Sequence, residues 1–168
     1  MSGTSVEPLE ALYRSWMSAV YGNPDMGLDA IRDMFEHWGD VTREPAGVDY
    51  VLDRAGDLDA MWLRPKNCRD DKVLLCAHGG GYVLGSMYSH RKVFGHFAAR
   101  IGCRALIVDY RRAPENPHPG PVDDMVSAYR WLLESGGVSG PQDVLFLGDS
   151  AGGALALALQ LRAREMGL

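Results

Sequence analysis

The sequence predicts an α/β fold with a mostly parallel sheet. Three strongly apolar runs, at residues 73–77, 104–110 and 144–147, are each followed by a stretch with the three- and four-residue spacing of a helix. Apolar strands of this kind are typical of a sheet covered on both faces, and repeated strand–helix units imply right-handed crossovers between parallel strands. The chain of 168 residues, 46% of them apolar, is long enough to bury one core.

The chain begins with two predicted amphipathic helices. Residues 9–20 carry an apolar face that ends before Asn23-Pro24, and residues 28–38 carry a second one, for which Gly39 is the predicted C-terminal signal. Both faces are rich in aromatic residues and methionine and therefore need a partner. The helices either pack as a pair on the core of their own domain or form a lid over an acyl pocket, and their periodicity does not decide between the two.

A predicted hairpin and a glycine-rich loop come next. Residues 48–53 and 60–63 are predicted strands around a turn near Gly56-Asp57. The apolar strand at 73–77 then ends in His78-Gly79-Gly80-Gly81. Consecutive glycines let backbone N–H groups turn toward a bound anion without interference from Cβ atoms, as an oxyanion hole requires. A flexible turn is the other interpretation.

Two further helices and a rigid loop complete the middle of the chain. The helices are predicted at residues 89–101, stopped by Gly102, and at 122–134, closed by Gly136-Gly137. The proline-rich segment 113–119 separates them. Because proline fixes φ and lacks a backbone donor, this segment is predicted to be a rigid loop rather than helix or strand.

The segment Gly148-Asp149-Ser150-Ala151-Gly152 stands between an apolar strand and an apolar helix and therefore predicts a nucleophile elbow. Side chains two residues before and after the serine would collide with the strand and the helix, which explains the two flanking glycines. Ser150 is the candidate nucleophile, and the N–H of Ala151 is placed to donate to the oxyanion that forms. A glycine-rich helix entry with a capping serine is the other interpretation.

Composition argues against several classes of function. The formal net charge of −5 and the scattered basic residues give no face for nucleic acid. We expect no membrane association and a cytoplasmic location, because the first residues lack a basic and an apolar region and no run reaches about 18 apolar residues. Cys68, Cys76 and Cys103 are an odd set without metal-ligand spacing, which favours a reducing compartment and predicts no metal site.

Three motifs together resemble those of the hormone-sensitive-lipase-like family of α/β-hydrolases, which includes bacterial esterases. They are the glycine loop at 78–81, the segment Asp-Tyr-Arg-Arg-Ala-Pro-Glu at 109–115, and the elbow at 148–153. Their order and approximate spacing match the family. The resemblance implies an α/β-hydrolase-type fold, with residues 1–44 as amino-terminal cap helices and 45–168 as a partial hydrolase core. Arg112 stands where the family usually has an apolar residue and is expected to affect packing only.

The resemblance also assigns roles to individual residues. It implies that Ser150 is the nucleophile and that the N–H groups of Gly80, Gly81 and Ala151 form the oxyanion hole. No cofactor is implied. The residues expected to support these motifs are His78, Gly79, Gly148, Asp149 and Gly152.

The rest of a catalytic triad is missing from the sequence. In this fold the acid and the histidine follow the nucleophile, but all five histidines precede Ser150, and Glu165 is the one acid after it. Glu165 lies roughly 20 Å along the helix from the serine and cannot orient a catalytic histidine. His78 is the one histidine expected near Ser150, with a structural role in its loop. Satisfied or solvent-exposed roles are expected for the others, which are His37, His90, His96 and His118.

The chain is therefore expected to be truncated just after the nucleophile helix. The strand at 144–147 would then become a sheet edge, and the helix at 154–161 would keep exposed leucines. This predicts poor solubility or dependence on a complementary carboxyl-terminal fragment.

Two functional hypotheses follow. The first is a carboxylic ester hydrolase acting on small-molecule esters of short acyl chains, for which this chain alone would be inactive or very weak because it lacks the base. The alternative is a catalytically incomplete fragment or a non-catalytic small-molecule binding module. The same elbow could also serve acyl transfer or the hydrolysis of a lactone or an amide, since pocket shape selects the leaving group.

Overall fold

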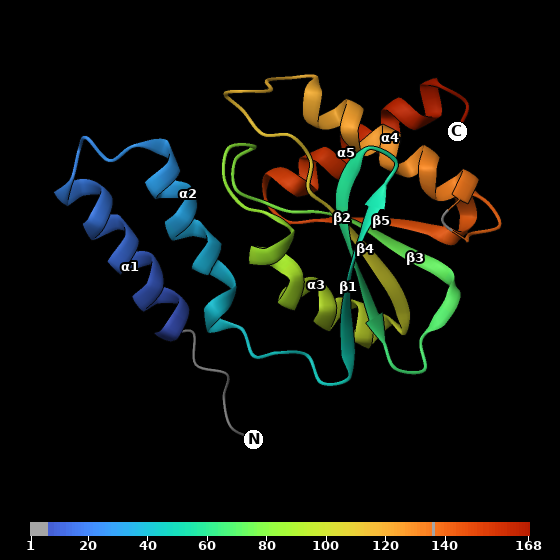
Figure 1. Cartoon of the computed structure of the whole chain (residues 1–168), viewed down its shortest axis with the longest axis horizontal. Helices are drawn as coiled ribbons and strands as arrows, with labels where there is room; N and C mark the ends of the chain where they lie inside the picture. The colour runs from blue at the N-terminus through green and yellow to red at the C-terminus, as the bar shows by residue number, and fades with distance from the viewer. Residues whose placement is uncertain (1–6, 136) are drawn as a thin grey trace.

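The computed structural model describes residues 7–135 and 137–168, and in this part of the chain the helices enclose a five-stranded sheet (Figure 1). The strand order is β1-β2-β4-β3-β5. β3 is parallel to β4 and β5, whereas β2 is antiparallel to β1 and β4, so four of these five strands point the same way. The predicted mostly parallel sheet is confirmed. The strands are β1 (Val48–Ala55), β2 (Leu58–Pro65), β3 (Arg69–Ala77), β4 (Cys103–Val108) and β5 (Val144–Gly148).

Helices cover both faces of the sheet because the central strands are apolar on both sides. On β4, Ala105 and Ile107 face α3, while Leu106 and Val108 face α4 and α5. All four side chains are fully buried. Figure 1 shows α4 and α5 together above the sheet and α3 below it. These helices are α3 (Met87–Ile101), α4 (Gly120–Ser135) and α5 (Ala151–Glu165).

The predicted elements are found with small shifts in their ends. α3 begins two residues early because Ser86 and Ser89 form a reciprocal capping box. β4 ends at Val108, so that Asp109, predicted to lie in the strand, is in the following loop. The proline-rich segment is a loop, as predicted. α4 ends at Ser135, and Gly136, half of its predicted stop signal, lies outside the described residues.

Two helices and a 3₁₀ turn precede the sheet and lie to one side of it (Figure 1). They are α1 (Glu7–Gly22), α2 (Leu28–Glu36) and η1 (His37–Val41). An aromatic cluster joins them: the rings of Trp16 and Phe35 are 5.4 Å apart, and Trp38 Nε1 donates to Tyr13 Oη at 2.9 Å. Within residues 7–135 and 137–168, every helix is too short or too polar to cross a bilayer.

The predicted role of Gly39 as a helix stop is wrong. α2 ends at Glu36, and the chain continues as the 3₁₀ turn η1 that contains Gly39. This glycine is buried against α3, where a Cβ would lie 2.6 Å from the carbonyl oxygen of Ser89. Close approach of two backbones, rather than helix termination, therefore explains the glycine.

β5 lies at an edge of the sheet, as predicted. In the described part of the chain it pairs with β3 alone. A groove of about 600 Å³ is lined by β5 together with residues of α4 and α5. Leu145 on β5 and Leu157 and Leu161 on α5 are each more than half exposed, so the predicted exposed leucines are also present. These exposed leucines beside the free edge of β5 form an apolar surface that is available to a partner.

Candidate active site

Ser150 lies exposed on the sharp turn between β5 and α5. Its backbone has φ 51° and ψ −122°, a strained conformation for a residue with a side chain. The flanking glycines leave no room for a methyl group: a Cβ on Gly152 would lie 2.1 Å from the Ala77 carbonyl oxygen, and one on Gly148 would lie 2.2 Å from that of Gly152. Ser150 occupies the N-cap of α5 but makes no capping hydrogen bond, so its interpretation as a capping serine is wrong.

The glycine loop after β3 is fixed by hydrogen bonds of its own backbone. Gly80, Gly81 and Tyr82 all have positive φ, at 111°, 64° and 64°. The N–H groups of Val83 and Leu84 donate to the Gly80 carbonyl at 3.1 and 2.8 Å. A Cβ on Gly80 would lie 2.2 Å from the Leu84 carbonyl oxygen. The loop is thus a defined turn that requires glycine, and a freely flexible turn does not describe it.

The sheet brings the glycine loop and the elbow together. Ala77, the last residue of β3, pairs in register with Gly148, the last residue of β5. Just beyond this pair, the Gly79 N–H donates to Asp149 Oδ1 at 3.0 Å, and a Cβ on Gly79 would lie 2.4 Å from Asp149 Oδ2. The two segments predicted to form the site are therefore direct neighbours, and their contact depends on two of the predicted motif residues.

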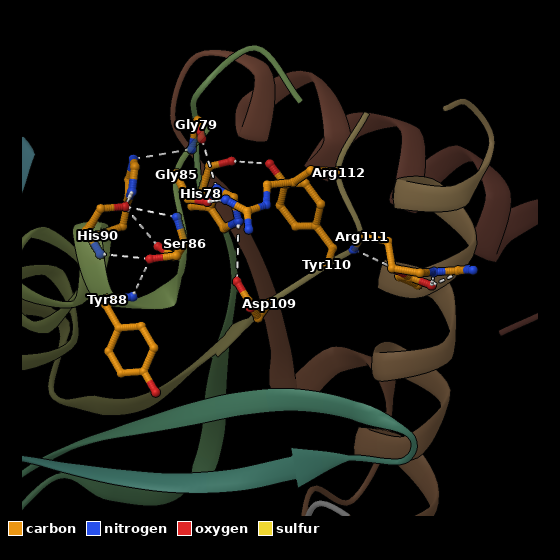
Figure 2. A network of polar contacts seen from close by, with 12 residues as sticks. His78, Gly79, Gly85, Ser86, Tyr88, His90, Asp109, Tyr110, Arg111 and Arg112 are labelled. Carbon is orange, nitrogen blue, oxygen red and sulfur yellow. Dashed lines mark hydrogen bonds and ion pairs between the residues drawn. The ribbon is translucent and has the colours of Figure 1, made fainter. Parts of the chain in front are cut away.

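His90 is a residue of this site that sequence reasoning missed, and the expectation that His78 alone lies near Ser150 is wrong. His90 is fully buried on α3, and its Nε2 lies 3.3 Å from the Gly79 nitrogen (Figure 2). The same Nε2 lies 3.3 Å from Asp149 Oδ1. Its ring stacks on Trp38 of η1 with centroids 4.5 Å apart. His90 thus connects the elbow acid to the amino-terminal segment. Nothing in its local sequence signals this, because its partners come from three distant parts of the chain.

Asp149 carries a negative charge next to the serine. Burial raises the pKa of its carboxyl group, but the hydrogen bond and the charge of His90 together with the Gly79 N–H outweigh burial and hold the pKa below its ordinary value. The carboxylate is therefore ionised at neutral pH and accepts hydrogen bonds that tie the elbow to the glycine loop.

His78 lies beneath the glycine loop and is fully buried (Figure 2). Its Nδ1 contacts the Gly79 carbonyl oxygen at 2.8 Å, and its ring stacks on Tyr110 with centroids 4.2 Å apart. The Tyr110 hydroxyl donates to the His78 carbonyl at 2.6 Å. Burial is the main cause that lowers the pKa of this imidazole to about 3, so it is neutral over the physiological range.

The buried His78 makes stability depend on pH. The unfolded chain protonates this histidine near its ordinary pKa of 6.5, whereas the folded chain does so only near 3, so the unfolded state binds more protons between these values. The free energy of unfolding is expected to fall as pH drops from 6.5 toward 3, by up to about 1.4 kcal/mol per pH unit for this group. Urea unfolding across that range should show a shallower slope for His78→Gln, while His37→Gln, at an exposed position, keeps the wild-type slope. Equal slopes for wild type and His78→Gln would contradict the assignment.

The other histidines and Arg112 lie outside this contact network or at its margin. His37 contacts Asp40, and His96 contacts the Arg43 carbonyl oxygen, both at exposed positions. Arg112 was expected to affect packing only, and this is wrong. Its Nη1 donates to the Gly85 carbonyl at 2.6 Å, at the point where the glycine loop leads into α3 (Figure 2). The guanidinium thus holds the Gly85 carbonyl group by a hydrogen bond, which an apolar residue at position 112 could not form.

An apolar cavity of about 330 Å³ adjoins the glycine loop. Its walls come from the loop, from the proline-rich segment, from the first turn of α4 and from the first two turns of α5. They include Gly81, Tyr82, Pro121, Val122, Leu155 and Ala158. The volume suits a small apolar group, and Gly81 connects the cavity to the predicted oxyanion-binding backbone.

Several known proteins resemble this chain in sequence. The α/β-hydrolase fold family matches residues 74–168. An acetyl-hydrolase of Streptomyces hygroscopicus is 44% identical over 132 residues, which are 79% of this chain and 42% of that protein. Esterase LipI of Mycobacterium tuberculosis is 34% identical over 154 residues, which are 85% of this chain and 47% of that protein. The chain spans about half the length of the curated relatives it matches.

Solved structures give the same result. An esterase of the bacterial hormone-sensitive lipase family aligns with a TM-score of 0.82 at 38% identity, over 93% of this chain and 52% of that one. An esterase/lipase from an uncultured bacterium aligns with a TM-score of 0.82 at 36% identity, over 98% of this chain and 55% of that one.

Proposed function

Since this chain belongs to the α/β-hydrolase fold family, we propose that it supplies the nucleophile and the oxyanion hole of a carboxylic ester hydrolase. The observation that carries the proposal is the exposed, strained Ser150 on an elbow that directly adjoins the glycine loop. The names of its relatives, acetyl-hydrolase and esterase, support ester hydrolysis as the reaction of the family.

The proposed reaction uses the elbow and the loop in two steps. Ser150 Oγ bonds to the acyl carbon, the oxyanion of the tetrahedral intermediate accepts from the N–H groups of Gly80, Gly81 and Ala151, and the ester C–O bond breaks to release the alcohol. Water then hydrolyses the acyl-serine and frees the acid. Both steps need a base to accept and return a proton.

We assign the base to a complementary carboxyl-terminal segment. All five histidines of this chain precede Ser150, and the two that contact the glycine loop, His78 and His90, are buried and engaged with backbone or Asp149. The free side of β5 and the exposed leucines of α5 offer the surface on which such a segment would dock. The acid and the histidine of the triad would then come from that segment.

The substrate we propose is a small ester with a short apolar acyl chain. The 330 Å³ cavity beside Gly81 would take an apolar group of limited size. Residues 1–44 would form a cap whose aromatic cluster borders the site, and residues 45–168 would form the hydrolase core. The link from Trp38 through His90 to Asp149 supports a cap in contact with the elbow.

The decisive experiment is complementation. The chain is mixed with the carboxyl-terminal half of one of the relatives named above, and hydrolysis of a short-chain p-nitrophenyl ester is measured with Ser150→Ala as the blank. The chain alone is expected to reach at most about 10³-fold over water, because the oxyanion hole acts without a base. The mixture is expected to exceed the chain alone in a Ser150-dependent way. Equal rates for wild type and Ser150→Ala in the mixture would refute the proposal.

A non-catalytic binding module is the second candidate. It is favoured by the apolar cavity together with the neutral, buried state of His78, since a pocket without an available base can bind without turnover. Binding of a short-chain ester to the chain alone, measured by calorimetry and unchanged in Ser150→Ala, with no turnover in the mixture, would support this candidate over the first.

A further inference from the structure

Arg32 of α2 reaches from the amino-terminal segment to two loops of the core. Its side chain is only 16% exposed. Nε donates to the Val83 carbonyl at 3.0 Å and Nη2 to the Ala113 carbonyl at 2.9 Å, and both Nη atoms bind Glu115 at 2.7 Å. These partners are 51, 81 and 83 residues away along the chain. One guanidinium therefore connects three segments that local sequence does not hold together.

The two carbonyl groups that Arg32 binds belong to segments that are themselves joined. The Ala113 N–H donates to the Tyr82 carbonyl at 2.8 Å, so the proline-rich loop lies directly against the glycine loop. Val83 in turn belongs to the turn that Gly80 begins, since its N–H donates to the Gly80 carbonyl. A guanidinium that fixes the Val83 carbonyl thus limits rotation of the peptide units that start at Gly80.

We propose that Arg32 is a positioning residue, which holds the glycine loop in the conformation that presents the N–H groups of Gly80 and Gly81 to the oxyanion. This inference rests on the function proposed above. Arg32 acts through backbone carbonyl groups and does not touch the substrate. Through Arg32, α2 contributes to the geometry of the site. A displacement of α2 would break the hydrogen bonds to the Val83 and Ala113 carbonyl groups together.

The geometry explains why arginine is needed here. A guanidinium presents five N–H donors in one plane, so it can bind two carbonyl groups and a carboxylate simultaneously, whereas a lysine ammonium is a point charge without this fixed fork. The hydrogen bond with Arg32 is the main cause that lowers the pKa of Glu115 to about 2, so the carboxylate stays charged at neutral pH. Glu115 is 54% exposed, however, and exposed ion pairs contribute little to stability. The two carbonyl contacts therefore dominate the positioning.

The test uses four variants of the chain. Arg32→Ala removes every contact, Arg32→Lys keeps the charge but not the fork, and Glu115→Gln weakens the ion pair alone. Arg14→Ala is the matched control, because Arg14 is a helical arginine that pairs with the neighbouring Glu10 on an exposed surface. Circular dichroism and thermal unfolding establish that each variant is folded before it is measured.

Hydrogen exchange followed by mass spectrometry reports the loop directly. We expect Arg32→Ala to accelerate exchange in the peptide that contains residues 80–84 by about tenfold or more, as loss of hydrogen bonds to a charged group predicts. The peptide at the β1–β2 turn should be unchanged. Arg32→Lys should resemble Arg32→Ala, Glu115→Gln should have a smaller effect, and Arg14→Ala none. Guanidinium, added to Arg32→Ala well below denaturing concentrations, should restore the protection.

Two results would overturn the inference. One is wild-type exchange in residues 80–84 of Arg32→Ala, and the other is equal acceleration throughout the chain, which would make Arg32 a general stabilising residue. Exchange needs no turnover, so this readout is separate from the complementation assay. If the mixture shows no Ser150-dependent hydrolysis while the loop still responds to Arg32, the proposed function fails and the role of Arg32 in holding the loop stands. If the mixture is active, Arg32→Ala should lower kcat with little change in KM.

Discussion

Replacing Gly152 by alanine is expected to lower the free energy of unfolding by about 3 kcal/mol, at the upper end for overpacking. The new Cβ would lie 2.1 Å from the Ala77 carbonyl oxygen and 2.6 Å from that of His78. Both atoms are backbone of β3 or of the residue that follows it, so no side chain can rotate away. α5 would have to move off the sheet, and Ser150 at its first turn would move with it. Urea unfolding followed by circular dichroism measures the loss.

The adjacent glycine provides the control. Gly153 lies one residue further along the same helix, and the nearest atom to its Cβ would be the Gly148 carbonyl oxygen at 3.3 Å. Alanine also has the higher helix propensity, so Gly153→Ala is expected to change the free energy of unfolding by less than about 1 kcal/mol. Similar losses for the two variants would show that the close contact of α5 with β3 is not what requires Gly152.

Gly80→Ala is expected to reduce Ser150-dependent ester hydrolysis by about 10²-fold or more, the loss typical of one missing oxyanion donor. Gly80 has φ 111°, and its Cβ would lie 2.2 Å from the Leu84 carbonyl oxygen. The turn must therefore open, which rotates the N–H groups that the proposed mechanism uses. The measurement is kcat and KM of the complemented enzyme, and the loss should fall mainly on kcat because the donors act on the transition state.

Gly81→Ala separates backbone strain from a steric clash. Gly81 also has positive φ, at 64°, but among the described residues no heavy atom beyond its two chain neighbours lies within 4 Å of its Cβ position. Alanine at this position would have to adopt the left-handed backbone conformation, which costs about 1–2 kcal/mol. Because no steric clash is added to this strain, Gly81→Ala should retain more activity than Gly80→Ala. If the two variants were equally active after correction for folded protein, the turn at Gly80 would not control the donors.

The sequence was most informative where function restricts the residue types. The elbow and the glycine loop could be located because a strained serine turn and a run of positive φ values both require glycine nearby. The central strands could be located because burial on both faces makes them apolar throughout. The resemblance drawn from three motifs is confirmed by the family match and by the aligned structures.

The contacts that hold the site together could not be predicted from sequence. Arg32 lies on a helix whose pattern indicates only an apolar face, and His90 lies in an ordinary crossover helix. Gly39 follows the pattern of a helix C-terminal signal, but in the structure it allows the backbone to approach α3 closely. Each of these residues acts on partners in other elements or loops, and local periodicity carries no information about such pairs.

The pairing of β3 with β5 determines at which stage of unfolding the site is disrupted. Because Ala77 and Gly148 are paired in the sheet, the points at which the glycine loop and the elbow begin are held together by ladder hydrogen bonds, in addition to the contact of Gly79 with Asp149. Loops usually open at low free energy, well before the rest of a protein. Here the starting points of the two loops can separate only when the ladder breaks, so the elbow and the base of the glycine loop should part in the same cooperative transition that unfolds the sheet.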